Sequence, residues 1–165
     1  MFSNEMKPSQ IVSLIDQVMP PVERPSKDRI VVHPEGCSSC EFLLHDLMAR
    51  PDSFVTPDLL LRICDEQYSL TPEAYRWILP EFLKAVINED ADELVVGFFV
   101  LSIAHNNEYF EQTRDRMALL THDDLELIRQ TLCHLQDSEP LPVYLNEDSF
   151  IDALNVVSKF QNGEQ

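Results

Sequence analysis

The residues that decide the fold lie in the stretch Thr71–Asn88, TPEAYRWILPEFLKAVIN. Its apolar side chains recur every three or four positions, the spacing that places them on one face of an α-helix. Thr71 can cap the free amide groups at the start of this helix, and Pro72 suits its first turn. Pro80 lies within the pattern, where its missing N–H group predicts a kink. The stretch therefore predicts a kinked amphipathic helix over residues 72–88.

Helical spacing also dominates the rest of the chain, and the alternation typical of strands is scarce. The segment 92–104 is apolar nearly all round, a pattern that predicts a helix at the centre of a bundle. Further helices are expected over residues 9–19, 39–48, 106–120, 125–135 and 148–160, and another is opened by Thr56 and Pro57, a cap and a first-turn proline. Together these segments predict an all-α fold, an irregular bundle of about six to seven helices.

The chain has 165 residues, the length of one ordinary domain, and we expect a single helical domain over residues 1–165. Several prolines in residues 20–36 predict a linker or an extended arm. Within it, three consecutive β-branched residues allow one short strand over residues 29–33. The polar residues 161–165 predict a frayed C-terminal tail.

The composition is that of a globular protein, because 44% of the residues are hydrophobic and 25% are charged. The longest apolar run, Leu94–Ala104, is shorter than the roughly 18 residues that a membrane-spanning helix needs. The first ten residues lack the basic stretch and apolar core of a secretory signal. We therefore expect a cytoplasmic protein that does not bind a membrane.

The charge is strongly acidic and unevenly distributed. The formal net charge is −17, and most of it falls on residues 51–165. Because a basic surface is needed to bind phosphates, a nucleic-acid partner is not expected. A basic protein is the complementary partner, since opposite charges steer association. An acidic surface is equally compatible with a role in solubility alone.

Two acidic groups are the candidate partner-binding surfaces. The first consists of Glu89, Asp90, Asp92 and Glu93, and the second of Asp123, Asp124 and Glu126. Each group precedes or opens an expected helix, where carboxylates also interact favourably with the positive end of the helix dipole. Helix capping, or a place on a solvated turn, is therefore the alternative to partner binding.

Cys37 and Cys40 form a Cys-x-x-Cys pair, which can hold a zinc ion because the turn between them points both thiolates to one side. His33 upstream and His45 downstream complete a set of four candidate zinc ligands. However, Cys40 and His45 are five residues apart, a spacing that points them in different directions on a helix. Cys133, or the histidine that follows it, could supply a ligand instead if folding brings that helix close.

The same cysteine pair has two other interpretations. A short strand, then Cys-x-x-Cys, then a helix is the local layout of thioredoxin-like active sites, in which the helix N-terminus lowers a thiol pKa. The remaining chain offers no further strands for the sheet of such a fold. Alternatively, both cysteines simply pack at the start of a helix. Cys64 and Cys133 are expected to pack as small buried hydrophobes.

The usual sequence signatures of catalysis are absent. Three glycines cannot build a Gly-rich phosphate loop, and neither His-Glu-x-x-His nor Gly-x-Ser-x-Gly occurs. In a reducing cytosol, free thiols or metal ligands are expected of the four cysteines rather than disulfides. We therefore expect a protein that is not an enzyme and has no catalytic residues.

Parts of the chain resemble a family of small, uncharacterised bacterial proteins. The likeness rests on the His and Cys-x-x-Cys element over His33–Cys40, and on Leu70–Leu83 with its proline opening, aromatic pair and Leu-Pro step. A fainter likeness covers Leu119–Thr121 and the segment 125–135. The histidine lies further from the first cysteine than in the compact pattern of that family. Because the family has no established activity, the resemblance implies the fold rather than the function.

The sequence favours a non-enzymatic acidic protein that neutralises or regulates a basic protein partner. Its most concrete form is an immunity protein that acts against a bacterial toxin. The acidic excess, the small size and the lack of catalytic motifs support this hypothesis. The alternatives are a zinc-stabilised structural or regulatory domain that uses Cys37 and Cys40 and, third, a thiol-dependent enzyme.

Overall fold

The computed structural model describes residues 6–49, 55–104, 110–138, 140–143 and 145–164 of the chain. Within these ranges the fold consists of eight α-helices and two short 3-10 helices. The α-helices are α1 (Pro8–Val18), α2 (Ser38–Met48), α3 (Pro57–Ile63), α4 (Pro72–Val86), α5 (Glu93–Ile103), α6 (Phe110–Leu119), α7 (His122–Asp137) and α8 (Glu147–Gln161). The 3-10 helices are η1 (Lys27–Arg29) and η2 (Gln67–Ser69). Among the described helices, none has both the length and the apolar character that crossing a membrane requires.

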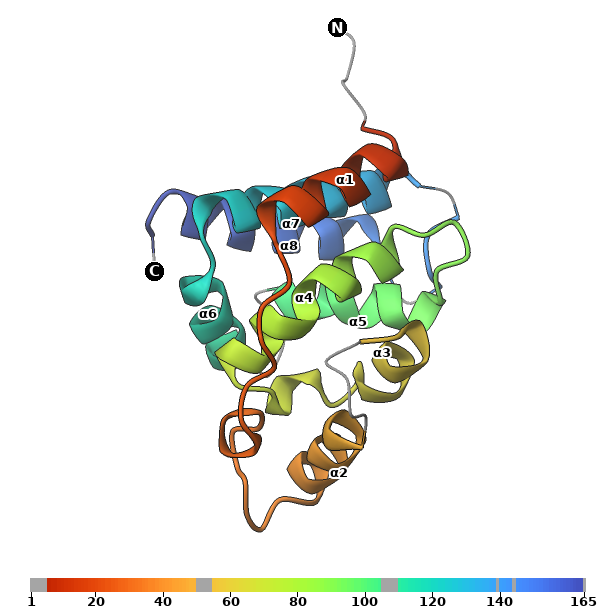
Figure 1. The fold of residues 1–165 in the computed structure, drawn as a ribbon. Coiled ribbons are helices and arrows are strands. Elements are labelled where there is room, and N and C mark those ends of the chain that lie inside the picture. The colour runs from red at the N-terminus through yellow and green to blue at the C-terminus, as the bar shows by residue number, and fades with distance from the viewer. Residues whose placement is uncertain (1–5, 50–54, 105–109, 139, 144, 165) are drawn as a thin grey trace, which may run out of the picture.

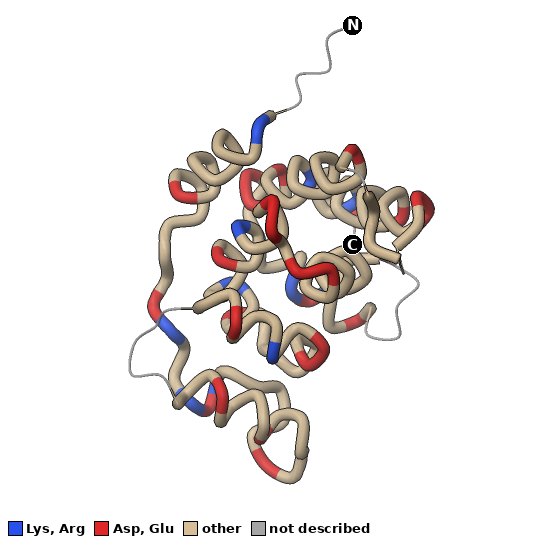
Figure 2. The backbone as a smooth tube through the Cα atoms, turned by 90° about the vertical axis from the view of Figure 1, so that its right-hand side faces the viewer, with Lys and Arg blue, Asp and Glu red and all other residues tan. Residues whose placement is uncertain are grey.

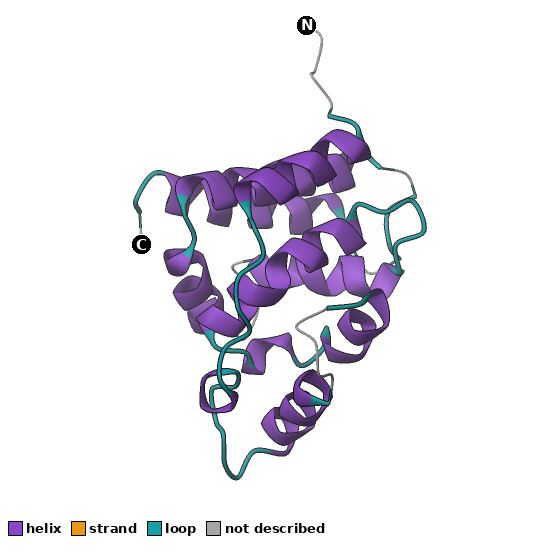
Figure 3. Cartoon of the chain, in the orientation of Figure 1, coloured by secondary structure: helices purple, strands orange, loops and turns teal. Residues whose placement is uncertain are grey.

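The helices form a bundle in which α1, α7 and α8 lie together at one end and α2 lies at the other (Figure 1). α7 packs against α8 and α1, and α5 packs between α4 and α8. α4 lies in the middle of the bundle, where it contacts α1, α5 and α6. α2 packs mainly against α3 and η2, so these two elements join it to the bundle. The prediction of an all-α fold is confirmed for the described residues (Figure 3).

Helix α4 forms where its sequence pattern predicts a helix. The Oγ1 atom of Thr71 accepts a hydrogen bond from the amide of Ala74 at 3.1 Å, and Pro72 occupies the first helical position. Pro80 lies inside the helix, which ends at Val86, two residues earlier than expected. Nine of its fifteen residues are buried, so α4 forms a large part of the core.

Helix α5 is the central apolar helix that the sequence predicts. Seven of its eleven residues are buried. Phe99 of α5 packs edge-on against Phe82 of α4, with ring centroids 5.3 Å apart and an interplanar angle of 70°. The first turn departs from the pattern, because Leu94 is 48% exposed there. The core of the bundle therefore lies along the contact between α4 and α5.

Two predictions of the fold are wrong in detail. The described residues contain eight α-helices instead of about six to seven, although α3 forms where Thr56 and Pro57 predict a helix start. In place of the possible strand over 29–33, the described arm holds η1 and one isolated antiparallel bridge between Val31 and Leu70. The helix expected over 106–120 is observed as α6, and its residues 106–109 lie outside the described ranges.

The arm between α1 and α2 runs along the bundle and connects its two ends (Figure 1). Its second half is fixed by backbone hydrogen bonds to the last residue of η2 and to the residue before α4. The amide of Val32 donates to the carbonyl of Ser69 at 2.9 Å, and the amide of Thr71 donates to the carbonyl of Ile30 at 2.9 Å. These bonds place the end of the arm beside the first turn of α2.

Candidate functional site

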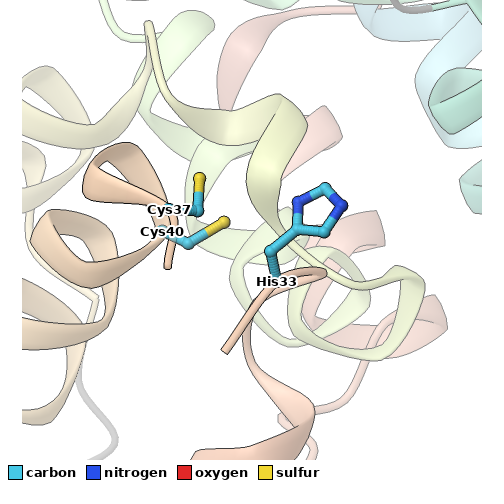
Figure 4. A group of neighbouring side chains, drawn as sticks. All are labelled: His33, Cys37 and Cys40. Carbon is cyan, nitrogen blue, oxygen red and sulfur yellow. The ribbon is translucent and has the colours of Figure 1, made fainter. Parts of the chain in front are cut away.

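The arm and the start of α2 bring three potential metal ligands together. The ligand atoms of His33, Cys37 and Cys40 all lie within 4.8 Å of one another. His33 belongs to the arm, Cys37 immediately precedes α2, and Cys40 lies in the first turn of that helix. Figure 4 shows the two thiols and the imidazole grouped beside one another. Three of the four predicted zinc ligands are therefore neighbours in space.

A turn at Gly36 makes this approach possible. Gly36 has a φ angle of 75°, a left-handed conformation that residues with a side chain adopt only with strain. After this turn Cys37 takes the N-cap position of α2. Because Cys37 and Cys40 are three residues apart at the start of a helix, their side chains lie on the same side of it.

The three side chains extend from the surface into the core. His33 is exposed and Cys37 is half-buried, whereas the side chain of Cys40 is completely buried. The sulfur of Cys40 accepts hydrogen bonds from the backbone amide of His33 and from the hydroxyl group of Ser69. The arm, α2 and η2 therefore meet at the buried cysteine.

The two thiols are hydrogen bonded and differ in acidity. The pKa of the Cys37 thiol is lowered, chiefly because the amide of Cys40 donates a hydrogen bond to its sulfur, and the Cys40 thiol adds a second bond. Burial raises the pKa of the Cys40 thiol, and its hydrogen bond to Cys37 raises that pKa further. Of the two thiols, Cys37 is therefore the more acidic.

The arrangement of these three side chains is compatible with a zinc ion. Two ligands of a tetrahedral zinc ion lie roughly 3.5 to 3.8 Å apart, given Zn–S bonds of about 2.3 Å and Zn–N bonds of about 2.0 Å. Donor atoms within 4.8 Å of one another need only small side-chain rotations to reach one ion. Two thiolates and an imidazole are also a donor set that zinc prefers. The fourth tetrahedral position falls to a group outside this cluster.

His45, the fourth predicted zinc ligand, does not join the cluster. It follows Cys40 by five residues on α2, which rotates it by about 140° around the helix axis. Its side chain is 81% exposed, and its Nδ1 atom lies 3.5 Å from a carboxylate oxygen of Asp46. The structure therefore separates His45 from the other three predicted ligands.

The remaining two cysteines lie elsewhere in the fold. Cys64 is 3% exposed, and burial raises the pKa of its thiol to about 11, in keeping with the expected packing role. Cys133 is only half-buried and lies on α7. Together with His134 it lines a pocket of about 680 Å³ between α7 and the start of α1. Neither Cys133 nor His134 belongs to the metal-ligand cluster.

The first acidic group forms an exposed turn between α4 and α5. Glu89, Asp90, Asp92 and Glu93 are all exposed. Asp92 also caps α5, because its side chain accepts a hydrogen bond from the amide of Leu94 at 2.9 Å. Glu89 and Glu93 line a pocket of about 520 Å³, with Val86 and Leu135 among its apolar lining residues. These carboxylates are accessible to a partner.

The second acidic group is largely engaged within the chain. Asp124 is 3% exposed and exchanges hydrogen bonds with Thr121 at 3.0 and 3.1 Å, the capping alternative that the sequence allows. Glu126 accepts hydrogen bonds from Arg129 at 2.5 and 2.7 Å. Only Asp123 of this group is fully exposed. The group therefore offers one free carboxylate rather than a surface of three.

The two acidic groups do not form one surface. The C-terminal end of α7 lines the same pocket as Glu89 and Glu93, whereas Asp123 lies at the N-terminal end of α7. A helix of sixteen residues is about 24 Å long, so the helix length separates the two groups. Figure 2 shows that acidic residues are spread over many elements of the described chain. A partner can use the turn at 89–93 without reaching Asp123.

Sequence reasoning missed the residues that hold the cluster in place. Ser69 of η2 contacts both Cys40 and the arm, and Gln67 and Arg116 are buried next to it in the fold. The helical spacing of α6 does indicate that Arg116 is buried. Arg116 lies three residues after the buried Thr113 and one before the buried Met117. That spacing places a charged residue on the inner face of a helix.

Comparison of this chain with known protein families, curated proteins and solved structures finds no match. The resemblance to a family of small bacterial proteins therefore stays a prediction.

Proposed function

We propose that this chain is a zinc-binding domain in which one ion, held by His33, Cys37 and Cys40, fastens α2 and the arm to the bundle. The single observation that carries the proposal is the approach of three donor atoms, from two different segments, to within 4.8 Å. Cysteines three residues apart at a helix start occur in many proteins. The third ligand from the arm is what distinguishes this site.

The position of α2 gives the ion a structural purpose. α2 lies at one end of the bundle and packs mainly against the short elements α3 and η2 (Figure 1). A zinc ion bound to Cys37 and Cys40 at the start of α2 and to His33 of the arm would join these two segments through coordinate bonds. Because the free energy of binding a structural metal adds to that of folding, the ion stabilises this end of the molecule.

Metal analysis of protein purified without a chelator tests the proposal. We expect one zinc ion per chain in the wild type and none in a Cys37→Ser/Cys40→Ser variant. Cys133→Ser, which changes a half-buried cysteine outside the cluster, is the matched control and should keep its zinc. A zinc-free wild type, or zinc that persists in the double variant, would rule the proposal out. Turnover of a disulfide substrate by zinc-free protein would instead support the thiol-dependent enzyme.

A basic protein partner is the second candidate function, and the turn at residues 89–93 is the surface that favours it. Its carboxylates border the pocket of about 520 Å³ whose lining includes Val86, Val96 and Leu135. A partner with a cationic surface and one protruding apolar side chain suits this combination. An immunity protein that inhibits a basic toxin remains the concrete form of this candidate.

A charge-matched pull-down tests the partner surface. The Glu89→Gln/Glu93→Gln variant should lose a basic protein that the wild type retains at low salt and releases at high salt. The control is Glu147→Gln/Asp148→Asn, which removes two exposed charges from the start of α8. Equal capture by both variants, or capture that salt does not weaken, counts against this candidate.

A further inference from the structure

The interior of the molecule contains a buried arginine with no carboxylate beside it among the described residues. Arg116 of α6 is 2% exposed. One terminal nitrogen of its guanidinium donates to the carbonyl of Gln67 and lies 3.5 Å from that of Leu70. The guanidinium also lies 4.9 Å from the ring centroid of Tyr75 and 5.7 Å from that of Tyr68. Its charge is therefore directed at the two ends of η2.

A second buried side chain holds η2 from another direction. Gln67, the first residue of η2, is completely buried. Its Nε2 atom donates to the carbonyl of Cys64 at 2.8 Å and to that of Phe98 in α5 at 3.2 Å. Together, Gln67 and Arg116 fasten this three-residue turn to α5, α6 and the end of α3.

The outer side of η2 contacts the metal-ligand cluster. The carbonyl of Ser69 accepts a hydrogen bond of 2.9 Å from the amide of Val32, the residue that precedes His33. The hydroxyl group of Ser69 bonds to the thiol of Cys40. One residue of η2 thus orients the backbone that carries the histidine and the side chain of the buried cysteine.

We propose that Arg116 is a positioning residue for the metal centre, acting through η2. By fixing the carbonyls at both ends of η2, Arg116 holds Ser69 where it orients Cys40 and the segment that carries His33. This proposal rests on the proposed zinc-binding function. Lone buried charges are costly, and an apolar side chain would fill the same space without that cost. The guanidinium offers one nitrogen to both carbonyls and a planar face to the two tyrosine rings, so it can define the shape of a turn as an apolar side chain cannot.

Zinc affinity, measured by competition with a chelator of known affinity, separates this role from a purely structural one. Loss of groups that orient metal ligands typically weakens metal binding by about 10 to 100-fold. We expect Arg116→Met to weaken zinc binding by about tenfold and Arg116→Lys, which retains the charge but not the planar fork, to weaken it less. Met117→Ala is the matched control, because Met117 is the next residue of α6 and is 1% exposed. It should lower thermal stability and leave zinc affinity unchanged.

Two further measurements keep the test decisive. Ser69→Ala removes the hydroxyl group next to Cys40 from a partly exposed residue, and we expect it to weaken zinc binding by about tenfold as well. Cobalt(II) substituted for zinc reports the geometry of the site, and its thiolate absorption should change in Arg116→Met and not in Met117→Ala. If Arg116→Met does not fold, the zinc affinity and cobalt spectrum of Arg116→Lys and Ser69→Ala are compared with those of the wild type and Met117→Ala instead.

The outcomes distinguish this inference from the proposed function. A wild-type chain that binds no zinc overturns both. A wild type that binds zinc, together with Arg116 variants that bind it as tightly and give the same cobalt spectrum, overturns the positioning role alone. Equal weakening by Met117→Ala also overturns it, because the effect would then follow from core stability.

Discussion

Glu126 joins α7 to α8 through a single carboxylate. It accepts hydrogen bonds from Arg129 at 2.5 and 2.7 Å and from Gln161 of α8 at 3.0 Å. The bonds from Arg129, followed by those from Gln161 and Gln130, lower the pKa of Glu126 from 4.5 to about 2. The ionised form of this side chain is therefore the one that stabilises the folded state.

This carboxylate predicts an acid-sensitive contribution to stability. Because the folded pKa is lowered, the contribution is complete above about pH 4.5 and is lost as the pH falls towards about 2. The side chain is 34% exposed, so solvent screening reduces the cost of Glu126→Gln near neutral pH to about 1 kcal/mol. Urea unfolding of both proteins across this pH range should show the difference disappear in acid. A difference that stays constant with pH would contradict the assignment.

Two adjacent aspartates should differ sharply in their effect on stability. Asp124 exchanges capping hydrogen bonds with Thr121 and lies 3.6 Å from the guanidinium of Arg76, whereas Asp123 is exposed. Asp124→Ala removes a cap and leaves a partly buried cation without its partner, so we expect a loss of about 2 kcal/mol. Asp123→Ala should change the free energy of unfolding by less than about 0.5 kcal/mol. If denaturant unfolding shows the same loss of free energy of unfolding for both variants, the stabilising role assigned to Asp124 is wrong.

At the scale of the elements, the contact between α4 and α5 is the strongest candidate for the centre of stability. Phe82 is 1% exposed and packs edge-on against the completely buried Phe99. Phe82→Ala should cost about 3 to 5 kcal/mol because it opens a cavity in the core. Phe42→Ala is the matched aromatic control, since Phe42 is 48% exposed and should cost less than about 1 kcal/mol. Thermal or urea unfolding gives both values, and similar losses would place the core elsewhere.

The longer helices could be predicted because their own sequences contain the necessary information. Thr71 and Thr121 cap α4 and α7 as their positions indicate, and the apolar spacing of α5 identifies it as central. In α2 the adjacent apolar residues Phe42 and Leu43 differ, because Phe42 is 48% exposed whereas Leu43 is buried. The neighbours of α2 decide which of its faces is covered, and its own periodicity does not contain that information.

The candidate site also has one part that follows from local sequence and another that depends on tertiary contacts. The spacing of Cys37 and Cys40 is local, so their approach follows from a helix start. The approach of His33 depends on a turn and on hydrogen bonds between the arm and η2, for which a single sequence gives only weak signals. Ser69 and Arg116 are remote from the cysteines in sequence, and nothing in their local pattern links them to a thiol. Tertiary contacts alone create that link.

For the molecule as a whole, self-repulsion should be the dominant electrostatic effect. The chain has 29 acidic residues against 12 lysines and arginines. Mutual repulsion of exposed carboxylates destabilises a compact state, and salt screens it over a Debye length of about 10 Å at 0.1 M. The melting temperature should therefore rise by a few degrees when sodium chloride is increased from low to moderate concentration. A melting temperature that falls or stays constant in calorimetry would contradict this expectation.

The dependence of the cluster on η2 has a consequence for the order of folding. η2 lies some forty residues after the arm in sequence, and Arg116 lies 49 residues after its hydrogen-bond partner Gln67. During synthesis, the segment with His33, Cys37 and Cys40 emerges long before the residues that orient it. On the role proposed for Arg116, the three side chains reach their final geometry only when α6 has docked. Under the proposed zinc-binding function, metal uptake would thus be a late event, and a chain truncated before α6 should retain the cysteines without the preorganised site.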